Sequence, residues 1–507
     1  MRVQSVVLAS AIAVVAATAA ATPALAIRGG VESAQAYSFM GSLQRPFDSP
    51  RADGHVCGVT LIAPQWVVTA GHCARNPTSA QAGTPRGWKV RIGSASTISG
   101  GRLVDVDKFY SYSPYPPQDG DLALLHLAAP VPSRPASLPS ARPADGAPTR
   151  IMGWGVTCDQ REPRCYPEHL REAGTVVQPA AECVLSGITA RELCVGAKDG
   201  SVAATNMDSG GPAVVRDGDG WTLIGAVSGS NGDDQPVVYT DVHSYLGWID
   251  GIVSGTSVPP DSPVPDMAGT AGLGGCSASV VRTAASRPGD PALLLTNGHC
   301  VQGDRPKPGS ALADQPADIP VQVEGRDGYT QATAKATRLV YATMTGTDVA
   351  LYRLDTTYAQ LKAAGARVFR LATTPARAGD RVDVVSAGVG ARFSCSVDAV
   401  VPHLREAGYQ QDDSYRYDSK CGASHGASGS PLVAADGVTV VGVHNTGNDD
   451  GGQCTENNPC EVAADGTVTV HKGQRYGQRT TMLPACLAAG SVLDLSRPGC
   501  TLTRPAA

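Results

Sequence analysis

One short motif occurs twice in this chain and constrains its fold more than any other feature. The sequence TAGHC spans residues 69–73, and TNGHC spans residues 296–300. In both copies an apolar run leads into the histidine, and an aspartate at the head of another apolar run, Asp121 or Asp348, follows that histidine by 49 residues. Such self-similarity predicts an internal duplication, with two copies of one domain in tandem.

Other features of the chain agree with two domains. A length of 507 residues suits two or three domains of ordinary size. The hexapeptide HLREAG also occurs twice, at residues 169–174 and 403–408, which we take as a further sign of duplication. Residues 254–270, SGTSVPPDSPVPDMAGT, are rich in Pro, Ser and Gly and predict a semi-extended linker. We therefore expect domains at residues 27–253 and 271–507.

The N-terminus has the pattern of a secretory signal peptide, which we place at residues 1–26. Arg2 precedes an apolar run over residues 6–21, and Ala24, Leu25 and Ala26 follow it. The run is too short and too rich in alanine for a membrane anchor. Export suits the 14 cysteines, an even number that can pair in an oxidising compartment. A net charge of −5 lacks the basic excess that nucleic-acid binding requires. We expect a secreted, extracellular protein with no membrane anchor and no nucleic-acid partner.

Short strand-like runs recur in both halves of the chain. Examples are WTLIGAVSG and PVVYTDV in the first half and RVDVVSAG and VTVVGVHN in the second. Turn signals separate such runs, and at Gly218-Asp219-Gly220 a hairpin turn is favoured over a calcium loop. Helix signals are few, and residues 241–253 give the best one. The pattern predicts an all-β fold with two barrel-type domains.

The first half contains residues suited to nucleophilic catalysis. A serine hydroxyl attacks well only if a histidine takes its proton and a carboxylate orients that histidine. WVVTAGHC contains His72, GDLALLHL has Asp121 near its head, and MDSGGP has Ser209 in a glycine-rich turn. The structural alternatives are a core histidine and a strand-capping aspartate, and the presence of several motifs in order argues against them.

These motifs, in the order His, Asp, Ser, resemble those of the trypsin/chymotrypsin family of serine endopeptidases. IMGWG at residues 151–155 and PVVYT at residues 236–240 also fall where that family has counterparts. The resemblance covers essentially the whole first domain and implies a chymotrypsin-like double β-barrel. It implies that His72 is the general base, that Asp121 orients it and that Ser209 is the nucleophile. The implied oxyanion hole uses the backbone N–H groups of Ser209 and Met207, although the family usually has glycine at the second position.

The resemblance also implies how the first domain becomes active and what it cuts. Removal of the signal peptide exposes an amine at Ile27, and the family pairs such an amine with the aspartate before the nucleophile, here Asp208. We expect signal peptidase itself to perform this activation. The implied specificity pocket includes Ala203, Ser228 and Val237. It lacks a charge, which predicts a small or medium apolar residue on the acyl side of the cut.

The second half repeats the same elements. LLLTNGHC contains His299, GTDVALYRL has Asp348 before an apolar strand, and HGASGSP contains Ser428, with Gly426 at the oxyanion position. Ala427 replaces the aspartate before the serine. A domain that begins in the middle of a chain has no free amine, and a buried carboxylate without a partner is costly. The replacement is therefore consistent with a working site.

Part of the second half resembles one branch of the family more closely. GASGSP and VVGVHNTG resemble the glutamyl-endopeptidase branch, whose pocket uses a histidine in this strand, and His444 occupies that position. The resemblance implies a preference for an acidic substrate residue through a charge-assisted hydrogen bond. A histidine that is hydrogen-bonded within the pocket wall is the alternative interpretation.

Six cysteines precede the linker and eight follow it, so each half can close its own bridges. The family resemblance implies two disulfides in the first half, and the two cysteines left over there are expected to close a local loop. By analogy it implies one disulfide in the second half. These pairs are Cys57–Cys73, Cys183–Cys194, Cys158–Cys165 and Cys276–Cys300. The remaining cysteines allow many connectivities, and their order along the chain suggests Cys395–Cys421, Cys454–Cys460 and Cys486–Cys500.

Together these patterns predict a secreted serine endopeptidase with two tandem domains, each acting through an acyl-enzyme. Its partners are expected to be protein or peptide substrates and protein inhibitors. We expect no metal and no cofactor, because no motif for either is present in the sequence. Two alternatives remain open. One domain is catalytic and the other is a pseudoprotease for docking or regulation, or the whole chain is a non-enzymatic binding protein on the same fold.

Overall fold

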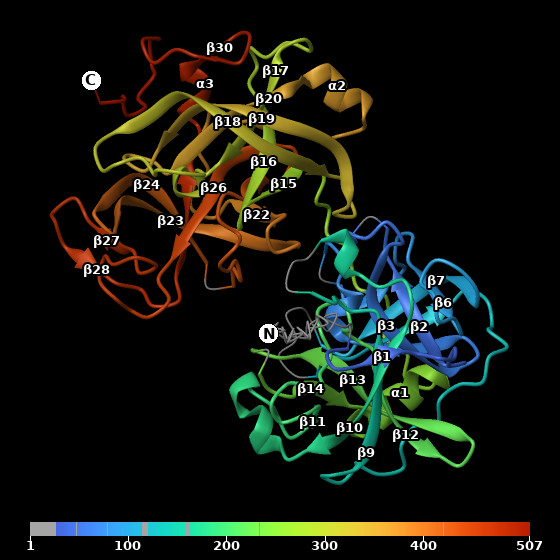
Figure 1. The fold of residues 1–507 in the computed structure, drawn as a ribbon. Coiled ribbons are helices and arrows are strands. Elements are labelled where there is room, and N and C mark those ends of the chain that lie inside the picture. Colours follow the sequence, from blue (N-terminus) through green and yellow to red (C-terminus); the bar gives the residue numbers. More distant parts are fainter. Residues whose placement is uncertain are drawn as a thin grey trace, which may run out of the picture. The chain divides into compact units, whose positions relative to one another are not determined.

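The computed structural model describes residues 27–506 apart from residues 47, 79, 114–119, 159–161, 233 and 419. The predicted signal peptide lies outside these described residues. The chain divides into two compact units (Figure 1). The first ends at Asp261 and lacks residues 75–80, which are grouped with the second unit that continues from Ser262. Both units consist mainly of strands, so the all-β prediction is confirmed. In the described part of the chain, no helix is both long and apolar enough to cross a membrane.

The first unit begins with a closed barrel. Its strands follow one another in the order β2, β3, β4, β8, β7 and β6, and β6 pairs with β2 to close the circle. Their bounds are β2 (Met40–Gln44), β3 (His55–Ala63), β4 (Trp66–Thr69), β6 (Lys89–Ile92), β7 (Arg102–Ser111) and β8 (Ala123–Leu127), and β5 (Ala82–Gly83) extends β7. The alternation expected of a barrel strand is clear in β6, where Val90 and Ile92 are buried and Lys89 is exposed.

A second barrel completes the first unit. Its strands follow one another in the order β9, β10, β11, β14, β13 and β12, and β12 pairs with β9 to close the circle. The bounds are β9 (Pro148–Gly153), β10 (Arg171–Gln178), β11 (Glu192–Val195), β12 (Pro212–Asp217), β13 (Gly220–Gly229) and β14 (Val237–Asp241), and β1 (Val31–Glu32) lies on β10. The helices are the short 3-10 turns η1 (Gly71–Ala74), η2 (Pro163–Cys165), η3 (Ala180–Ser186) and η4 (Val242–Tyr245), and α1 (Leu246–Val253).

The local sequence signals of this unit form the expected structures. Gly218-Asp219-Gly220 forms the hairpin turn between β12 and β13, where Asp217 pairs with Gly220 and Gly218 has a φ of 56°. The predicted helix at residues 241–253 begins with η4 and continues as α1. Asp241 caps it, because its carboxylate accepts a hydrogen bond from the N–H of His243.

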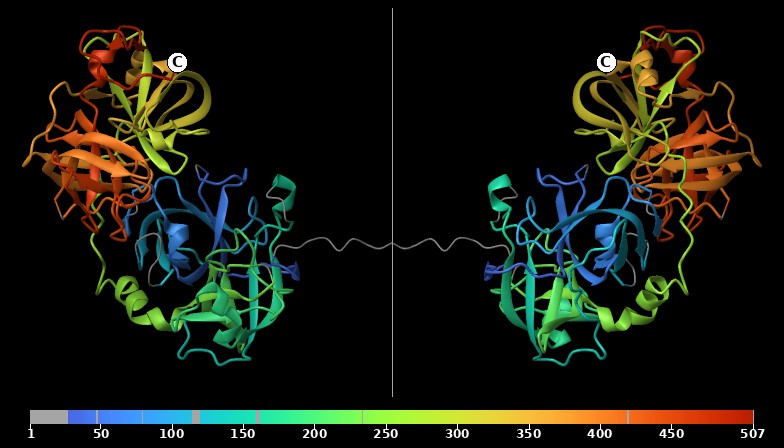
Figure 2. Two further views of the ribbon diagram at one scale, coloured as in Figure 1. Left: turned by 90° about the vertical axis from the view of Figure 1, so that its left-hand side faces the viewer. Right: turned by 90° about the vertical axis from the view of Figure 1, so that its right-hand side faces the viewer.

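The second unit repeats the two-barrel plan (Figure 2). Its first barrel closes in the order β15, β18, β19, β20, β17 and β16, and its second in the order β22, β23, β24, β29, β26 and β25. The bounds in the first barrel are β15 (Thr270–Leu273), β16 (Cys276–Arg282), β17 (Pro291–Thr296), β18 (Ala311–Glu324), β19 (Thr330–Thr343) and β20 (Val349–Thr357). Those in the second are β22 (Arg381–Ser386), β23 (Ala391–Glu406), β24 (Tyr409–Tyr417), β25 (Pro431–Ala434), β26 (Thr439–Gly447) and β29 (Arg475–Arg479).

Smaller elements complete the second unit. β21 (Phe369–Leu371) pairs in parallel with β16 and β26 and so joins the two barrels. The others are η5 (Gly298–Cys300), α2 (Tyr358–Ala363), β27 (Cys460–Val462), β28 (Val468–Thr469), α3 (Leu483–Cys486), β30 (Leu487–Ala488) and β31 (Val492–Leu493). α2 was not among the helices predicted from the sequence, although Thr357 and Gln360 form a capping box at its start.

The repeated hexapeptide HLREAG does not belong to the duplication. In the first unit it leads into the start of β10, where Arg171 pairs with Gly153 at the end of β9. In the second unit it ends β23, and the position equivalent to Arg171 is Ala391, which pairs with Ser386 at the end of β22. The two hexapeptides therefore lie at opposite ends of corresponding strands. The interpretation of this repeat as evidence for duplication is wrong, whereas the matching barrels carry that evidence.

The exposed connection between the units is shorter than residues 254–270. Most side chains from Ser254 to Val264 are exposed, whereas Met267 and Thr270 are fully buried. The difference arises because Met267 packs in an apolar cluster of the second unit, and β15 begins at Thr270. Burial of Met267 removes apolar surface from water, which composition alone does not reveal.

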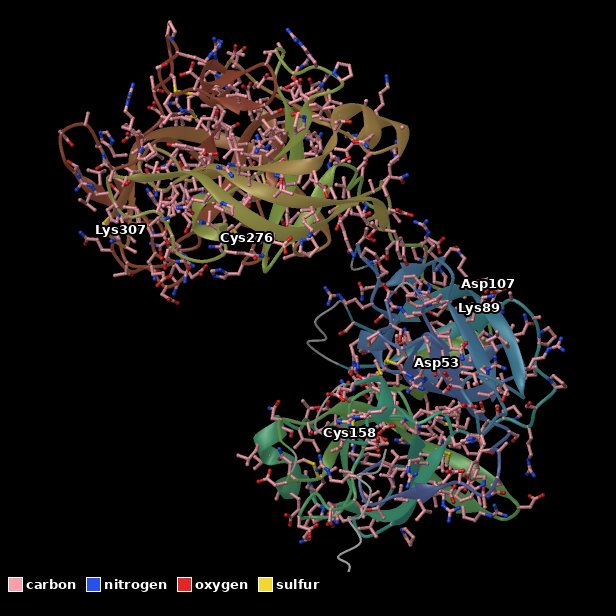
Figure 3. The ribbon with its side chains drawn as sticks, turned by 45° about the horizontal axis from the view of Figure 1, so that its top comes forward. Asp53, Lys89, Asp107, Cys158, Cys276 and Lys307 are labelled. Atoms are coloured by element: carbon pink, nitrogen blue, oxygen red, sulfur yellow. A yellow bond between two sulfur atoms is a disulfide. The ribbon has the colours of Figure 1, made fainter. Side chains whose placement is uncertain are left out.

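Seven disulfides link the cysteines, and they join the same pairs that the sequence analysis expected. They are Cys57–Cys73, Cys158–Cys165, Cys183–Cys194, Cys276–Cys300, Cys395–Cys421, Cys454–Cys460 and Cys486–Cys500. Figure 3 labels one cysteine of each unit, Cys158 and Cys276. Cys57–Cys73 and Cys276–Cys300 each tie the segment that contains the repeated histidine to a neighbouring strand.

Candidate active site

Strand pairing brings the predicted histidine and aspartate of the first unit together. His72 lies in η1 directly after β4, and Asp121 directly precedes β8, which pairs with β4. His72 Nδ1 lies 2.7 Å from Asp121 Oδ2, and the backbone N–H of His72 donates to Oδ1 at 2.8 Å. Because a carboxylate only accepts, Nδ1 carries the hydrogen, and Nε2 of a neutral ring is left as a base.

The carboxylate of Asp121 is held in its charged form. The side chain of Ser228, a predicted pocket residue, donates to Asp121 Oδ2 at 2.8 Å. Burial raises the pKa of Asp121, but the hydrogen bonds and charge of His72 and the Ser228 bond together bring this pKa below its usual value. A buried, ionised carboxylate in this place stabilises an imidazolium on His72.

The loop with Ser209 packs against the segment that leads into His72. Gly58 N–H donates to Ser209 O at 2.8 Å, and Gly210 N–H donates to Val227 O at 2.8 Å. Gly210 has a φ of 72°, and a Cβ there would lie 2.8 Å from the backbone nitrogen of Ala70. Glycine is required at this position because the two segments touch.

Met207 adopts the left-handed conformation, with a φ of 74°. A side chain in this conformation costs about 1–2 kcal/mol, so the departure from glycine that the sequence showed is a strained one. The Met207 carbonyl accepts a hydrogen bond from His55 Nε2 at 3.1 Å, and His55 Nδ1 lies 2.7 Å from Ser42 Oγ. Burial, followed by the charge of Arg51, lowers the pKa of His55 to about 3. His55 is therefore neutral and holds this peptide in place.

Asp208 and Ile27, the predicted activation pair, are in contact and fully buried. The backbone N–H groups of Gly155 and Thr205 donate to the Asp208 carboxylate at 2.7 and 2.8 Å. Burial raises the pKa of Asp208 to about 6, although hydrogen bonds from Thr205, Gly155 and the backbone of Ile27 oppose this rise. A Cβ on Gly153 or Gly155 would overlap this carboxylate, so the glycines of IMGWG leave room for it.

The other predicted pocket residues of the first unit lie in an apolar cluster. Ala203 and Val237 are 1% and 3% exposed and pack in one cluster with Val227 and Tyr239. Neither side chain carries a charge. The cluster that they share consists of apolar side chains and Tyr239.

The second unit reproduces the histidine–aspartate pair. His299 lies in η5 after β17, and its Nδ1 is 2.8 Å from Asp348 Oδ2. Its backbone N–H donates to Asp348 Oδ1 at 3.1 Å. Burial lowers the pKa of His299, but the charge and hydrogen bond of Asp348, with the charge of Glu406, raise it above its usual value. The imidazolium form is thus more stable than in a free histidine.

The loop with Ser428 repeats the geometry of the Ser209 loop. Ser277 N–H donates to Ser428 O at 2.7 Å, and the left-handed Gly429, with a φ of 80°, packs against Thr296. Gly426 has a φ of 86°, which glycine adopts without strain. The Ser428 hydroxyl donates to Asn445 O at 3.1 Å.

His444 lies in the wall of a cleft but cannot provide a charge there. The cleft has a volume of about 150 Å³ and is also lined by His299 and Ser428. The His444 ring is 2% exposed and stacks on Tyr417, with ring centres 5.8 Å apart. Burial, and then the charge of Arg475, lowers the pKa of His444 to about 3. The ring is therefore neutral, and its Nδ1 is buried without a hydrogen-bond partner among the described residues, unlike the hydrogen-bonded histidine of the alternative interpretation.

The structure adds residues that sequence reasoning missed. They are His55, which holds Met207, Asn445, which accepts from Ser428, and Arg475 and Glu406 in the cleft of the second unit. Asn445 follows His444 as Ser228 follows Val227. An alignment of the two halves would therefore have paired Asn445 with Ser228 and marked it as a candidate site residue. The other contacts join residues far apart in the chain, and no local motif marks them.

Comparisons with known proteins agree with this geometry. Residues 27–249 match the family described as Trypsin, and residues 276–443 match the one described as Trypsin-like peptidase domain. Trypsin 5G1 of Aedes aegypti is 35% identical over 211 residues, which are 38% of this chain and 74% of the relative. The thrombin-like enzyme halystase of Gloydius blomhoffii is 32% identical over 238 residues, 42% of this chain and 92% of the relative. Human Trypsin-3 is 33% identical over 219 residues, covering 41% and 68%.

Proposed function

Because the chain belongs to the trypsin family of serine endopeptidases, we propose that it carries two separate catalytic centres in tandem. The first domain comprises residues 27–253, and the second comprises residues 271–507 together with the buried segment from Met267 to Thr270 that precedes them. The observation that carries the proposal is the repeated pair His72–Asp121 and His299–Asp348, in which one carboxylate binds both Nδ1 and the backbone N–H of its histidine. That arrangement leaves Nε2 of each ring as a base.

In the first domain, Ser209 attacks the scissile carbonyl as His72 Nε2 takes the hydroxyl proton. The C–O bond that forms gives a tetrahedral oxyanion, which the backbone N–H groups of Met207 and Ser209 stabilise. Collapse breaks the C–N bond, His72 gives its proton to the leaving amine, and an acyl-enzyme remains. Water then enters by the same steps, with His72 again as base, and Ser209 is regenerated.

The second domain acts in the same way through Ser428, His299 and Asp348. Its oxyanion donors are the backbone N–H groups of Gly426 and Ser428. Gly426 supports this role, because its left-handed conformation matches that of Met207 without the strain of a side chain. In the attack, the Ser428 hydroxyl gives up its hydrogen bond to Asn445 O and donates its proton to His299 instead.

Removal of residues 1–26 activates the first domain. The burial of Ile27 beside Asp208 supports this step, because a new α-amine at Ile27 would pair with a carboxylate that now lacks a cation. The second domain needs no such step, since Ala427 stands where the first domain has Asp208. Signal cleavage also implies export, which seven disulfides suit.

The first domain prefers a small or medium apolar residue on the acyl side of the cut. The apolar, uncharged side chains of Ala203 and Val237 support this preference. Protein and peptide chains are the substrates, and protein inhibitors that present such a residue are expected partners.

A chain with one active domain and one docking domain is the second candidate function. The strained Met207 favours it, since a misplaced oxyanion donor typically costs about 10²–10³ in rate. His55 acts against this effect by holding the Met207 peptide. The two candidates differ in how many serines are activated.

Labelling with a fluorophosphonate separates these candidates. The reagent reacts with a serine that a formed triad and oxyanion hole activate, and mass spectrometry locates the modified peptide. Label on both Ser209 and Ser428 in the secreted protein is the expected result. Ser209→Ala and Ser428→Ala are matched controls, each of which removes one label and keeps the other. Label on a single serine would support the docking candidate, and label on neither would refute both.

A further inference from the structure

The cleft of the second unit contains a cation that the sequence analysis did not assign. Arg475, the first residue of β29, lines this cleft together with Ser428 and His444. Its Nε donates to Ala423 O at 2.9 Å, and its Nη1 donates to Asp449 Oδ1 at 2.7 Å. No residue that the structure describes accepts a hydrogen bond from Nη2, and the side chain is 22% exposed. One edge of the guanidinium is therefore available to a ligand in the cleft.

The duplication shows which position Arg475 occupies. In the first unit Gly210, the residue after Ser209, donates its N–H to Val227 O at 2.8 Å. In the second unit Gly429 donates in the same way to His444 O at 3.0 Å. Val227 on β13 and His444 on β26 are therefore equivalent.

The strands next to β13 and β26 extend this equivalence. Val227 pairs with Tyr239, and His444 pairs with Gly477. Val237 lies two residues before Tyr239 on β14, and Arg475 lies two residues before Gly477 on β29. Arg475 is therefore equivalent to Val237 of the first domain. The first domain has an apolar side chain at this position and the second has a cationic one.

The charge of Arg475 acts on its neighbours at this end of the cleft. After burial, it is the largest cause that lowers the pKa of His444. Asp449 is the nearby carboxylate, and its second oxygen, Oδ2, lies 2.5 Å from His425 Nε2. Asp449 therefore positions Arg475, but the same carboxylate also binds the His425 ring. This sharing weakens the ion pair between Asp449 and the Arg475 guanidinium.

The acidic side chains of the cleft are held by other groups. Glu406 accepts the N–H of Asn457 at 2.7 Å, and its charge acts on His299. Glu456 faces Arg305 at 3.8 Å. Neither carboxylate forms an ion pair with Arg475 among the described residues, so the guanidinium is not neutralised from that side.

We propose that Arg475 determines the specificity of the second domain by binding the acidic side chain of a substrate residue on the acyl side of the scissile bond. This inference rests on the proposed function, because it requires Ser428 to be a nucleophile. A guanidinium donates charge-assisted hydrogen bonds to a carboxylate, and Nη2 is the donor in place for one. Gly447 supports the arrangement, because a Cβ there would overlap the Arg475 guanidinium. The chain then cuts after small apolar residues with one domain and after Glu or Asp with the other.

The test uses the full secreted chain with Ser209→Ala, so that the second domain alone acts. Peptide p-nitroanilides that differ only in Glu or Gln before the scissile bond are compared, because these residues have the same shape and differ in charge. We expect kcat/KM to be about tenfold or more higher for Glu, as for other charge-assisted hydrogen bonds. Arg475→Met should reduce this ratio to about one, and Arg475→Lys should retain part of it. Arg479→Met, on the same strand but paired with Asp413, is the control that keeps the ratio.

Fluorophosphonate labelling of Ser428 in the same samples separates two kinds of failure. Suppose that Ser428 is labelled and that the Ser209→Ala chain with Arg475 unchanged cleaves the Gln peptide as fast as the Glu peptide. The specificity inference is then wrong and the proposed function stands. The same conclusion holds if Arg475→Met is labelled and keeps the Glu preference. If Ser428 is not labelled in the Ser209→Ala chain, the proposed function of the second domain fails and the inference fails with it. Should Arg475→Met not fold, the Glu-to-Gln ratio of the unaltered chain and of Arg475→Lys still decides.

Discussion

A chain that begins at Ala26 instead of Ile27 tests the activation pair most directly. In the uncut chain, burial raises the pKa of Asp208 from 3.8 to about 6, against hydrogen bonds from Thr205, Gly155 and Ile27. A difference of about two pKa units, at about 1.4 kcal/mol each, means that ionised Asp208 costs about 3 kcal/mol at pH 7. A free amine at Ile27 supplies a cation beside this fully buried carboxylate and should remove most of that cost.

The sign of the pH dependence follows from proton linkage. Folded Asp208 in the uncut chain binds its proton more tightly than unfolded Asp208. The destabilisation is therefore absent below about pH 4, grows between about pH 4 and 6, and is complete above about pH 6. In the chain that begins at Ile27, the ammonium keeps Asp208 ionised until the amine loses its proton near pH 8 or so. The two chains should differ by about 3 kcal/mol at pH 7 and by less at pH 4.

Tryptophan fluorescence makes the measurement possible in the intact chain. All five tryptophans lie in the first unit, at positions 66, 88, 154, 221 and 248, so urea unfolding followed by fluorescence reports that unit alone. Asp208→Asn is the matched control, because an amide in this place carries no charge and the advantage of the Ile27 chain should disappear. Equal stability of the two chains at pH 7, or an advantage that persists in Asp208→Asn, would refute the reasoning.

Three other predictions concern the two sites. Met207→Gly should raise the free energy of unfolding by about 1 kcal/mol, because the gain from relieving a φ of 74° exceeds the entropy that glycine adds to the unfolded chain; unchanged urea midpoints would contradict this. His55→Ala should cost about 1–3 kcal/mol and slow the labelling of Ser209, since it leaves the Met207 carbonyl without its donor; labelling at the original rate would show that His55 does not hold the loop. Asp348→Asn should reduce the labelling rate of Ser428 by about 10⁴, because His299 then adopts the wrong tautomer. The rate at Ser209 in the same molecule is the internal control, and an equal loss at both serines would point to misfolding.

The fold and the central residues were accessible from the sequence because their signals are local. A continuous apolar run leads into His72 and another follows Asp121, and the same pattern recurs at His299 and Asp348. The same logic failed for the repeated HLREAG, because identical letters fall at opposite ends of corresponding strands. Strand register depends on which neighbours pair, and a hexapeptide does not encode its neighbours.

By itself, the sequence determined the duplication, the likeness of each half to serine endopeptidases, and the residue types that such chemistry requires. Only the tertiary structure decided which of the predicted residues carry charge. Histidine is a residue type that can carry a positive charge in a pocket, but packing of His444 on Tyr417 removes its ring from water. This burial lowers its pKa and makes it neutral. Arg475 lies 31 positions later in a strand without any motif, yet pairing of β29 with β26 places it in the cleft with Ser428. The reason is that the charge of a titratable group depends on its desolvation and on the charges around it, which long-range packing sets.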